Sequence, residues 1–94
     1  MTFQIPKRVK VGGLIYQVKI VDKIGGEDCS GLIDGNKLII SIEKADIDAM
    51  NEVFLHEIFH AMNMEWPEER TESTAMQMYQ VLVDNKGIFD YGKK

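Results

Sequence analysis

The sequence predicts a small α+β domain in which two β-hairpins form a mostly antiparallel sheet and two packed helices follow. Two turns that contain glycine, at Gly12-Gly13 and Asp34-Gly35, each separate short segments that are rich in β-prone apolar residues; this pattern is typical of hairpins. The second half of the chain carries apolar residues at helical spacing. Because the chain has 94 residues, we expect residues 1–94 to form a single domain.

The hairpins are expected within residues 8–42. In residues 8–22, apolar residues alternate with basic or polar ones on both sides of the Gly12-Gly13 turn. The second hairpin turns at Asp34-Gly35, where glycine accepts a positive φ angle. It returns over Leu38–Ile42, which is the most β-prone segment of the chain because it is rich in isoleucine.

The first helix is expected over residues 46–64. Asp46 suits its start, because a carboxylate there can cap free backbone N–H groups. On a helical wheel one apolar stripe contains Ile47, Met50, Phe54, Ile58, Ala61 and Met62. His56 and His60, the two histidines of the chain, lie on roughly the opposite side. We therefore expect the stripe to pack in the core and the histidines to face a cleft.

The second helix is expected over residues 68–86. Trp66-Pro67 interrupts the first helix, proline suits a helix start, and Gly87 suits a helix end. The apolar stripe of this helix contains Ala75, Met76, Tyr79, Leu82 and Val83. Methionines at helical spacing, interpreted here as core residues, are Met50, Met62, Met64, Met76 and Met78. The alternative for these methionines is a partner-binding surface.

The segment His56-Glu57-Ile58-Phe59-His60 has the pattern H-E-x-x-H. On a helix, histidines four positions apart project from one face, so both imidazoles can bind one zinc ion. Glu57 is then close enough to act as a general base toward a water on the metal. The motif therefore predicts zinc, two of its ligands and a general base, and it indicates hydrolysis by a zinc-activated water once a third ligand and a suitable fold accompany it.

A catalytic zinc site usually has three protein ligands. The chain has no third histidine, so we expect a carboxylate to complete the site. The downstream candidates are Glu65, Glu68, Glu69 and Glu72. Glu68 and Glu72 lie along the apolar stripe of the second helix, where a carboxylate is costly unless it is paired or bound to a metal. The wheel favours Glu72, with Glu68 as the alternative.

The composition argues against two classes of partner and indicates a cellular compartment. The net charge of -4 and the absence of a long Lys/Arg block argue against nucleic acid as a partner. No segment has the pattern of a signal peptide or the length of a transmembrane helix, so no membrane partner is expected. Cys29 is the single cysteine, which fits a reducing cytoplasm. We interpret Cys29 as a small loop residue, with an inhibitory zinc ligand as the alternative.

Residues 31–85 resemble a known group of proteins. The run from His56 to Asn63, followed by Glu72-Ser73-Thr74-Ala75, resembles the gluzincin-type small metallopeptidases. This group includes the ImmA/IrrE family and short zincin-like proteins of phages and mobile elements. The order of a hairpin, a short gap and a metal helix is also similar. The resemblance implies a minimal zincin-like domain in a bacterial host cytoplasm.

The resemblance also implies a function. A gluzincin-like hydrolase would be a zinc metalloprotease in which Glu57 is the general base. The metal ligands that the resemblance implies are His56, His60 and Glu72. The substrate would be a peptide or protein that lies extended along Leu38–Ile42 as an edge strand. Zinc would stabilise the oxyanion, with Tyr79 or Tyr91 as a candidate second group; the alternative is that no tyrosine takes part.

The alternative function is a binding or regulatory protein of phage or mobile-element origin. Such a protein would keep the zincin fold with a structural or silent zinc site.

Overall fold

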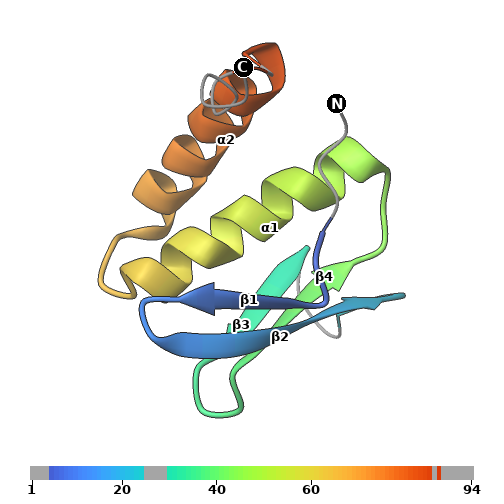
Figure 1. Cartoon of the computed structure of the whole chain (residues 1–94), viewed down its shortest axis with the longest axis vertical. Coiled ribbons are helices and arrows are strands. Elements are labelled where there is room, and N and C mark those ends of the chain that lie inside the picture. Colours follow the sequence, from blue (N-terminus) through green and yellow to red (C-terminus); the bar gives the residue numbers. More distant parts are fainter. Residues whose placement is uncertain (1–4, 25–29, 86, 88–94) are drawn as a thin grey trace.

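A computed structural model of the chain describes residues 5–24, 30–85 and 87. Four strands are followed by two helices: β1 (Arg8–Val11), β2 (Leu14–Val21), β3 (Gly31–Asp34), β4 (Ile39–Glu43), α1 (Ile47–Met62) and α2 (Glu68–Asp84). Helix α1 lies across one face of the sheet, and α2 packs on α1 rather than on the sheet (Figure 1). The predicted α+β class, with two hairpins before two helices, is confirmed.

The strand order in the sheet is β1-β2-β4-β3. Each predicted hairpin is antiparallel, and the two hairpins join through a parallel pair formed by β2 and β4. The isoleucine-rich strand β4 is therefore an inner strand, and the expectation that Leu38–Ile42 is an edge strand was wrong. A nearly continuous apolar run is typical of a strand with neighbours on both sides. The free edges of the described sheet belong to β1 and β3.

The core lies between the sheet and α1. The buried side chains that form it come from alternate positions of the two inner strands: Tyr16, Val18, Ile40 and Ile42. The residues of α1 that pack against them are Met50, Val53, Phe54 and Ala61. Ile47 and Met62, at the two ends of the predicted stripe, are exposed, because the ends of α1 extend beyond the core.

Helix α1 begins at Ile47, one residue after the predicted start, because Asp46 is its cap. The carboxylate of Asp46 accepts a hydrogen bond of 2.9 Å from the backbone N–H of Ala49, which caps the first turn. The helix ends at Met62, two residues before the predicted end. After the segment that joins the two helices, Pro67 directly precedes the first residue of α2, as expected for a proline at a helix start.

The face of α2 that contacts α1 is centred on two small residues. Thr71 and Ala75 are buried, whereas Met76 of the predicted stripe has 50% of its surface exposed. Small side chains here allow the two helices to approach closely. The interpretation of the methionines as core residues is wrong for four of them, since the exposed ones are Met62, Met64, Met76 and Met78.

The predicted end of α2 differs slightly from the observed one. Helix α2 ends at Asp84 and Asn85 caps it through its backbone N–H, and Lys86 lies outside the described residues. Within the described part of the chain, neither helix is both long enough and apolar enough to cross a membrane.

Candidate metal centre

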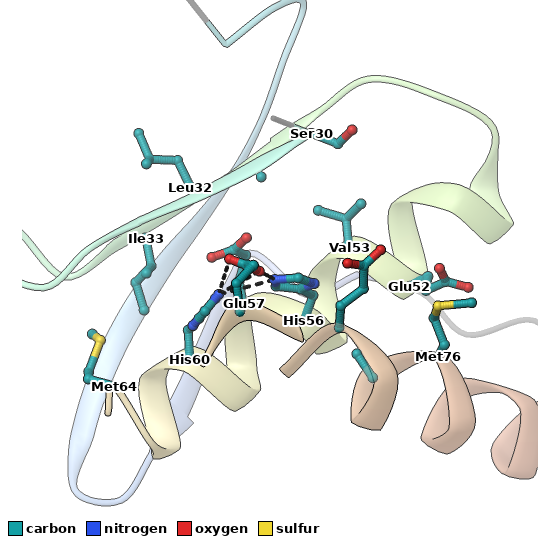
Figure 2. Close-up of a pocket in the computed structure, with 14 residues that line it drawn as sticks. Ser30, Leu32, Ile33, Glu52, Val53, His56, Glu57, His60, Met64 and Met76 are labelled. Carbon is teal, nitrogen blue, oxygen red and sulfur yellow. Dashed lines mark hydrogen bonds and ion pairs between the residues drawn. The ribbon is translucent and has the colours of Figure 1, made fainter. Parts of the chain in front are cut away.

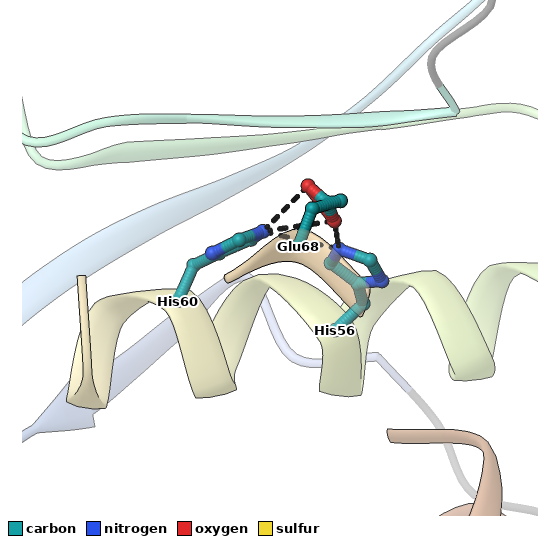
Figure 3. Close-up of side chains that lie close together, drawn as sticks. All are labelled: His56, His60 and Glu68. Atoms are coloured by element: carbon teal, nitrogen blue, oxygen red, sulfur yellow. Dashed lines mark hydrogen bonds and ion pairs between the residues drawn. The ribbon is translucent and has the colours of Figure 1, made fainter. Parts of the chain in front are cut away.

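The two histidines of the motif lie side by side on α1. Their Nε2 atoms are 3.1 Å apart and their ring centroids are 4.8 Å apart. This proximity follows from helical geometry, because residues four apart occupy the same face of a helix. Figure 3 shows both rings turned toward the same point above the helix.

Glu68, the first residue of α2, completes the group. Both of its carboxylate oxygens lie 3.3 Å from Nε2 of His60, and it also forms an ion pair with His56. The ligand atoms of these three side chains all lie within 4.8 Å of one another. Figure 3 shows the carboxylate between the two imidazole rings.

The donor set fits a zinc ion. Two imidazole nitrogens and a carboxylate oxygen are the ligands of many catalytic zinc sites. With zinc–ligand distances of about 2.1 Å, two ligand atoms of a tetrahedral site are about 3.4 Å apart. Two of the three separations, 3.1 Å between the histidines and 3.3 Å from His60 to Glu68, are close to that value, whereas His56 and Glu68 lie closer together.

The structure brings Glu68, rather than Glu72, to the histidines. Both glutamates line the same cavity, as expected for residues one turn apart on one helix face. The chain reverses at Pro67, whose carbonyl accepts the backbone N–H groups of Arg70 and Thr71. Helix α2 therefore begins directly beside the last turns of α1, and its first residue lies nearest to the imidazoles.

The environment of Glu68 keeps it charged. Burial raises the pKa of its carboxyl. The positive charges of His56 and His60, and the hydrogen bonds with them, lower it by more, so the pKa lies below its usual value. A carboxylate that stays ionised is the form that binds a metal ion.

Glu57 lies in the opposite environment. Its side chain is buried, with 5% of the residue exposed. Desolvation raises the pKa of this carboxyl to about 7; His60 opposes the rise and Glu68 adds to it. A carboxyl with a pKa near neutral pH can both accept and return a proton there.

Strand β3 covers Glu57 at a glycine. A Cβ atom on Gly31 would lie 2.7 Å from Oε2 of Glu57 and 2.5 Å from Cγ1 of Val53. Both distances are shorter than a normal van der Waals contact. The missing side chain at Gly31 therefore allows the strand to pass directly over the carboxyl and bury it.

A cavity of about 690 Å³ lies over the three clustered side chains. It is bounded by β3 on one side and by the two helices on the other (Figure 2). Its lining consists of Ser30, Gly31, Leu32, Ile33, Glu52, Val53, His56, Glu57, His60, Met64, Glu68, Glu72, Ala75 and Met76.

The free edge of β3 borders this cavity. The backbone N–H of Glu43, at the end of β4, donates to the carbonyl of Ser30. These two residues lie opposite each other and form a hydrogen-bonded pair. Bonding alternates along an antiparallel ladder. The N–H and C=O groups of Gly31 and Ile33 therefore point away from β4, toward the free edge of the strand.

Of the two tyrosines proposed for the oxyanion, only Tyr79 lies within the described residues. The hydroxyl of Tyr79 donates to Asp48 at 2.6 Å and lies 3.4 Å from Nδ2 of Asn51. Burial and the bond to Asp48 raise the pKa of Tyr79. Tyr79 does not line the cavity, so it ties the helices together instead. Tyr91 and Cys29 lie outside the described residues.

Sequence reasoning missed the residues that shape the cavity around the histidines. Ile33 and Met64 line it, and Gly31 sets the approach of β3. The position of Gly31 at the start of a strand was visible in the sequence. Its contact with Glu57 was not, because it depends on which strand lies next to α1.

Comparisons of the chain with protein-family models, curated proteins and solved structures find no match.

Proposed function

We propose that the protein is a zinc-dependent, gluzincin-like peptidase. The main support is one geometric observation: His56, His60 and Glu68 converge within 4.8 Å beside a buried glutamate in an open cavity. In this proposal the three converging side chains hold the zinc ion, and Glu57 is the general base.

The chemistry of the site divides between the metal and the protein. A zinc ion held there would supply Lewis acidity, which polarises a peptide carbonyl and makes a water molecule nucleophilic near neutral pH. Glu57 accepts the proton of that water and later returns it to the leaving amine. His56 and His60, fixed on one rigid helix, hold the geometry, and Glu68 adds the negative charge of the third ligand.

The free edge of β3 supports a peptide as the substrate. The N–H and C=O groups of Gly31 and Ile33 can pair with an extended chain, which adds a strand to the sheet. The peptide would then lie over the histidines, because β3 crosses the cavity above α1 (Figure 2). In this proposal the substrate strand pairs with β3 instead of with the sequence-predicted Leu38–Ile42.

A binding protein with a silent zinc site is the second candidate. The observation that favours it is the cover that β3 provides at Gly31 over Glu57, which has only 5% of its surface exposed. A glutamate covered in this way could stabilise the site without reaching a substrate.

Cleavage of a degenerate peptide library distinguishes the two candidates. Zinc-loaded protein is incubated with the library, and new termini are identified by mass spectrometry. We expect cleavage by the native chain and a loss of at least about 100-fold in Glu57→Gln, with zinc retained. Glu69→Gln, an exposed glutamate outside the cavity, should cleave normally.

Equal cleavage by Glu57→Gln and the native chain contradicts the peptidase mechanism. Stoichiometric zinc in the native chain without any cleavage supports the binding protein.

A further inference from the structure

The two ends of the cavity differ in chemical character. Ile33 and Met64 lie beyond His60 at one end, and Glu52 lies beyond His56 at the other (Figure 2). A peptide that passes over the histidines along β3 would therefore meet an apolar surface on one side of the metal centre. On the other side it would meet the carboxylate of Glu52, with the exposed side chain of Met76 beside it.

The cavity carries an excess of negative charge. Among the described residues, its lining contains four glutamates and no lysine or arginine. Glu68 pairs with the histidines and Glu57 is covered by β3, which leaves Glu52 and Glu72. The ion pairs among the described residues include neither of these two. An approaching cationic side chain would supply the missing opposite charge.

The spacing along α1 indicates which substrate position meets Glu52. Glu52 lies roughly six positions before the residue midway between His56 and His60. This spacing corresponds to roughly 9 Å along the helix axis. An extended peptide advances about 3.3 Å per residue. Glu52 therefore lies opposite a substrate side chain about two or three residues from the bond above the metal centre.

The apolar end is built from side chains that a substrate would cover. Met64 has 54% of its surface exposed although it is apolar, and Ile33 lies next to it in Figure 2. Methionine is unbranched and adapts to the shape of an apolar partner. Burial of an apolar substrate side chain against these two residues would be favourable.

We propose that the cavity selects peptides with an apolar side chain on one side of the scissile bond and a lysine or arginine two or three residues away on the other. Glu52 is the residue that determines the basic preference, and Met64 with Ile33 determines the apolar one. This inference rests on the proposed peptidase function and names its substrate class.

A charge reversal tests the basic preference. Zinc-loaded native chain, Glu52→Lys and Glu52→Gln are compared on the same degenerate peptide library. The native chain should favour Lys or Arg at one position, Glu52→Gln should lose that preference, and Glu52→Lys should favour Asp or Glu. The ratio of kcat/KM for a Lys peptide over its Glu counterpart should fall by about tenfold in Glu52→Lys.

Asp84→Lys is the matched control, because Asp84 is exposed at the end of α2 and does not line the cavity. It makes the same change in net charge and should keep the native preference. A native preference without basic residues, or the same change in Asp84→Lys as in Glu52→Lys, overturns the assignment of Glu52.

A second pair of variants tests the apolar end. Met64→Ala should lower kcat/KM for peptides with a large apolar residue by about tenfold and leave peptides with alanine there nearly unchanged. Met78→Ala, which removes an exposed methionine outside the cavity, should change neither. If both variants behave alike, the apolar assignment is wrong.

The library also separates this inference from the function on which it rests. Cleavage without side-chain preference overturns the selectivity alone. No cleavage by the zinc-loaded native chain overturns the peptidase function and the selectivity with it.

Discussion

Two glutamates of the candidate metal centre have opposite electrostatic environments. Glu57 is buried under β3 and has a pKa raised to about 7, whereas the histidines lower the pKa of the exposed Glu68. A group that exchanges protons near neutral pH suits a base, and a group that stays ionised suits a ligand. The difference in burial therefore supports a different role for each residue.

Gly31→Ala tests whether β3 must lie directly on Glu57. The new methyl group would approach Val53 and Glu57 within 2.7 Å, so the strand or the helix must shift. We expect a loss of about 1–3 kcal/mol in the free energy of unfolding, measured by urea denaturation, together with reduced cleavage. Gly87→Ala, where a methyl group meets nothing within 4 Å, should cost little; equal stability of the two variants contradicts the close approach.

The pKa of Glu57 makes a prediction for the metal-free protein. Its pKa rises from 4.5 to about 7 on folding, so the folded state holds the proton more tightly. The stabilisation is complete below pH 4.5 and is lost as the pH rises through 7. Its size is on the order of 3 kcal/mol.

Urea denaturation with a chelator measures this effect. The stability of the native chain relative to Glu57→Gln should fall between pH 4.5 and 8. The same comparison with Glu69→Gln, an exposed site, should not change over this range. A pH-independent difference between the native chain and Glu57→Gln contradicts the burial of an ionisable carboxyl.

At the scale of the secondary-structure element, the start of α2 determines which glutamate lies nearest to the histidines. Glu68 and Glu72 lie one turn apart on the same face, so helical periodicity alone cannot separate them. Their distances from the histidines depend on where α2 begins and how it crosses α1. The sequence predicted the helix start correctly at residue 68, but the crossing depends on the packing of Thr71 and Ala75 against α1.

Zinc affinities of two alanine variants test this choice of ligand. Glu68→Ala should weaken binding by more than about 100-fold, and Glu72→Ala by less than about tenfold, because loss of a ligand exceeds loss of a neighbouring charge. Competition with a chromophoric chelator measures both affinities, and Glu69→Ala serves as the control. The reverse order of the first two variants would identify Glu72 as the ligand.

The strands show what local patterns can and cannot predict. Both hairpins were predictable, because turn residues and alternation act over a few neighbouring positions. The joining of β2 to β4 in parallel was not, since it brings together residues that are distant in the sequence. The same limit explains why β4 was taken for an edge and why β3 was not recognised as the border of the cavity.

At the scale of the whole molecule, α2 contacts α1 and none of the four strands within the described part of the chain. Near the start of α1, the described contacts between the two helices include a hydrogen bond from Tyr79 to Asp48. Near the end of α1 they include the cluster of Glu68 with the histidines. A metal ion at the cluster would link the helices through ligands from both. Its binding should therefore stabilise the fold by an amount that grows with the logarithm of the ratio of free zinc concentration to Kd.

Zinc titration by calorimetry, compared between the native chain and His60→Ala, tests the metal centre most directly. We expect the native chain to bind one zinc ion and to gain about 2.7 kcal/mol in stability at a free zinc concentration 100 times the Kd. His60→Ala should lose binding by more than about 100-fold. If the native chain binds no zinc, or binds it equally well without His60, the proposed metal centre is wrong.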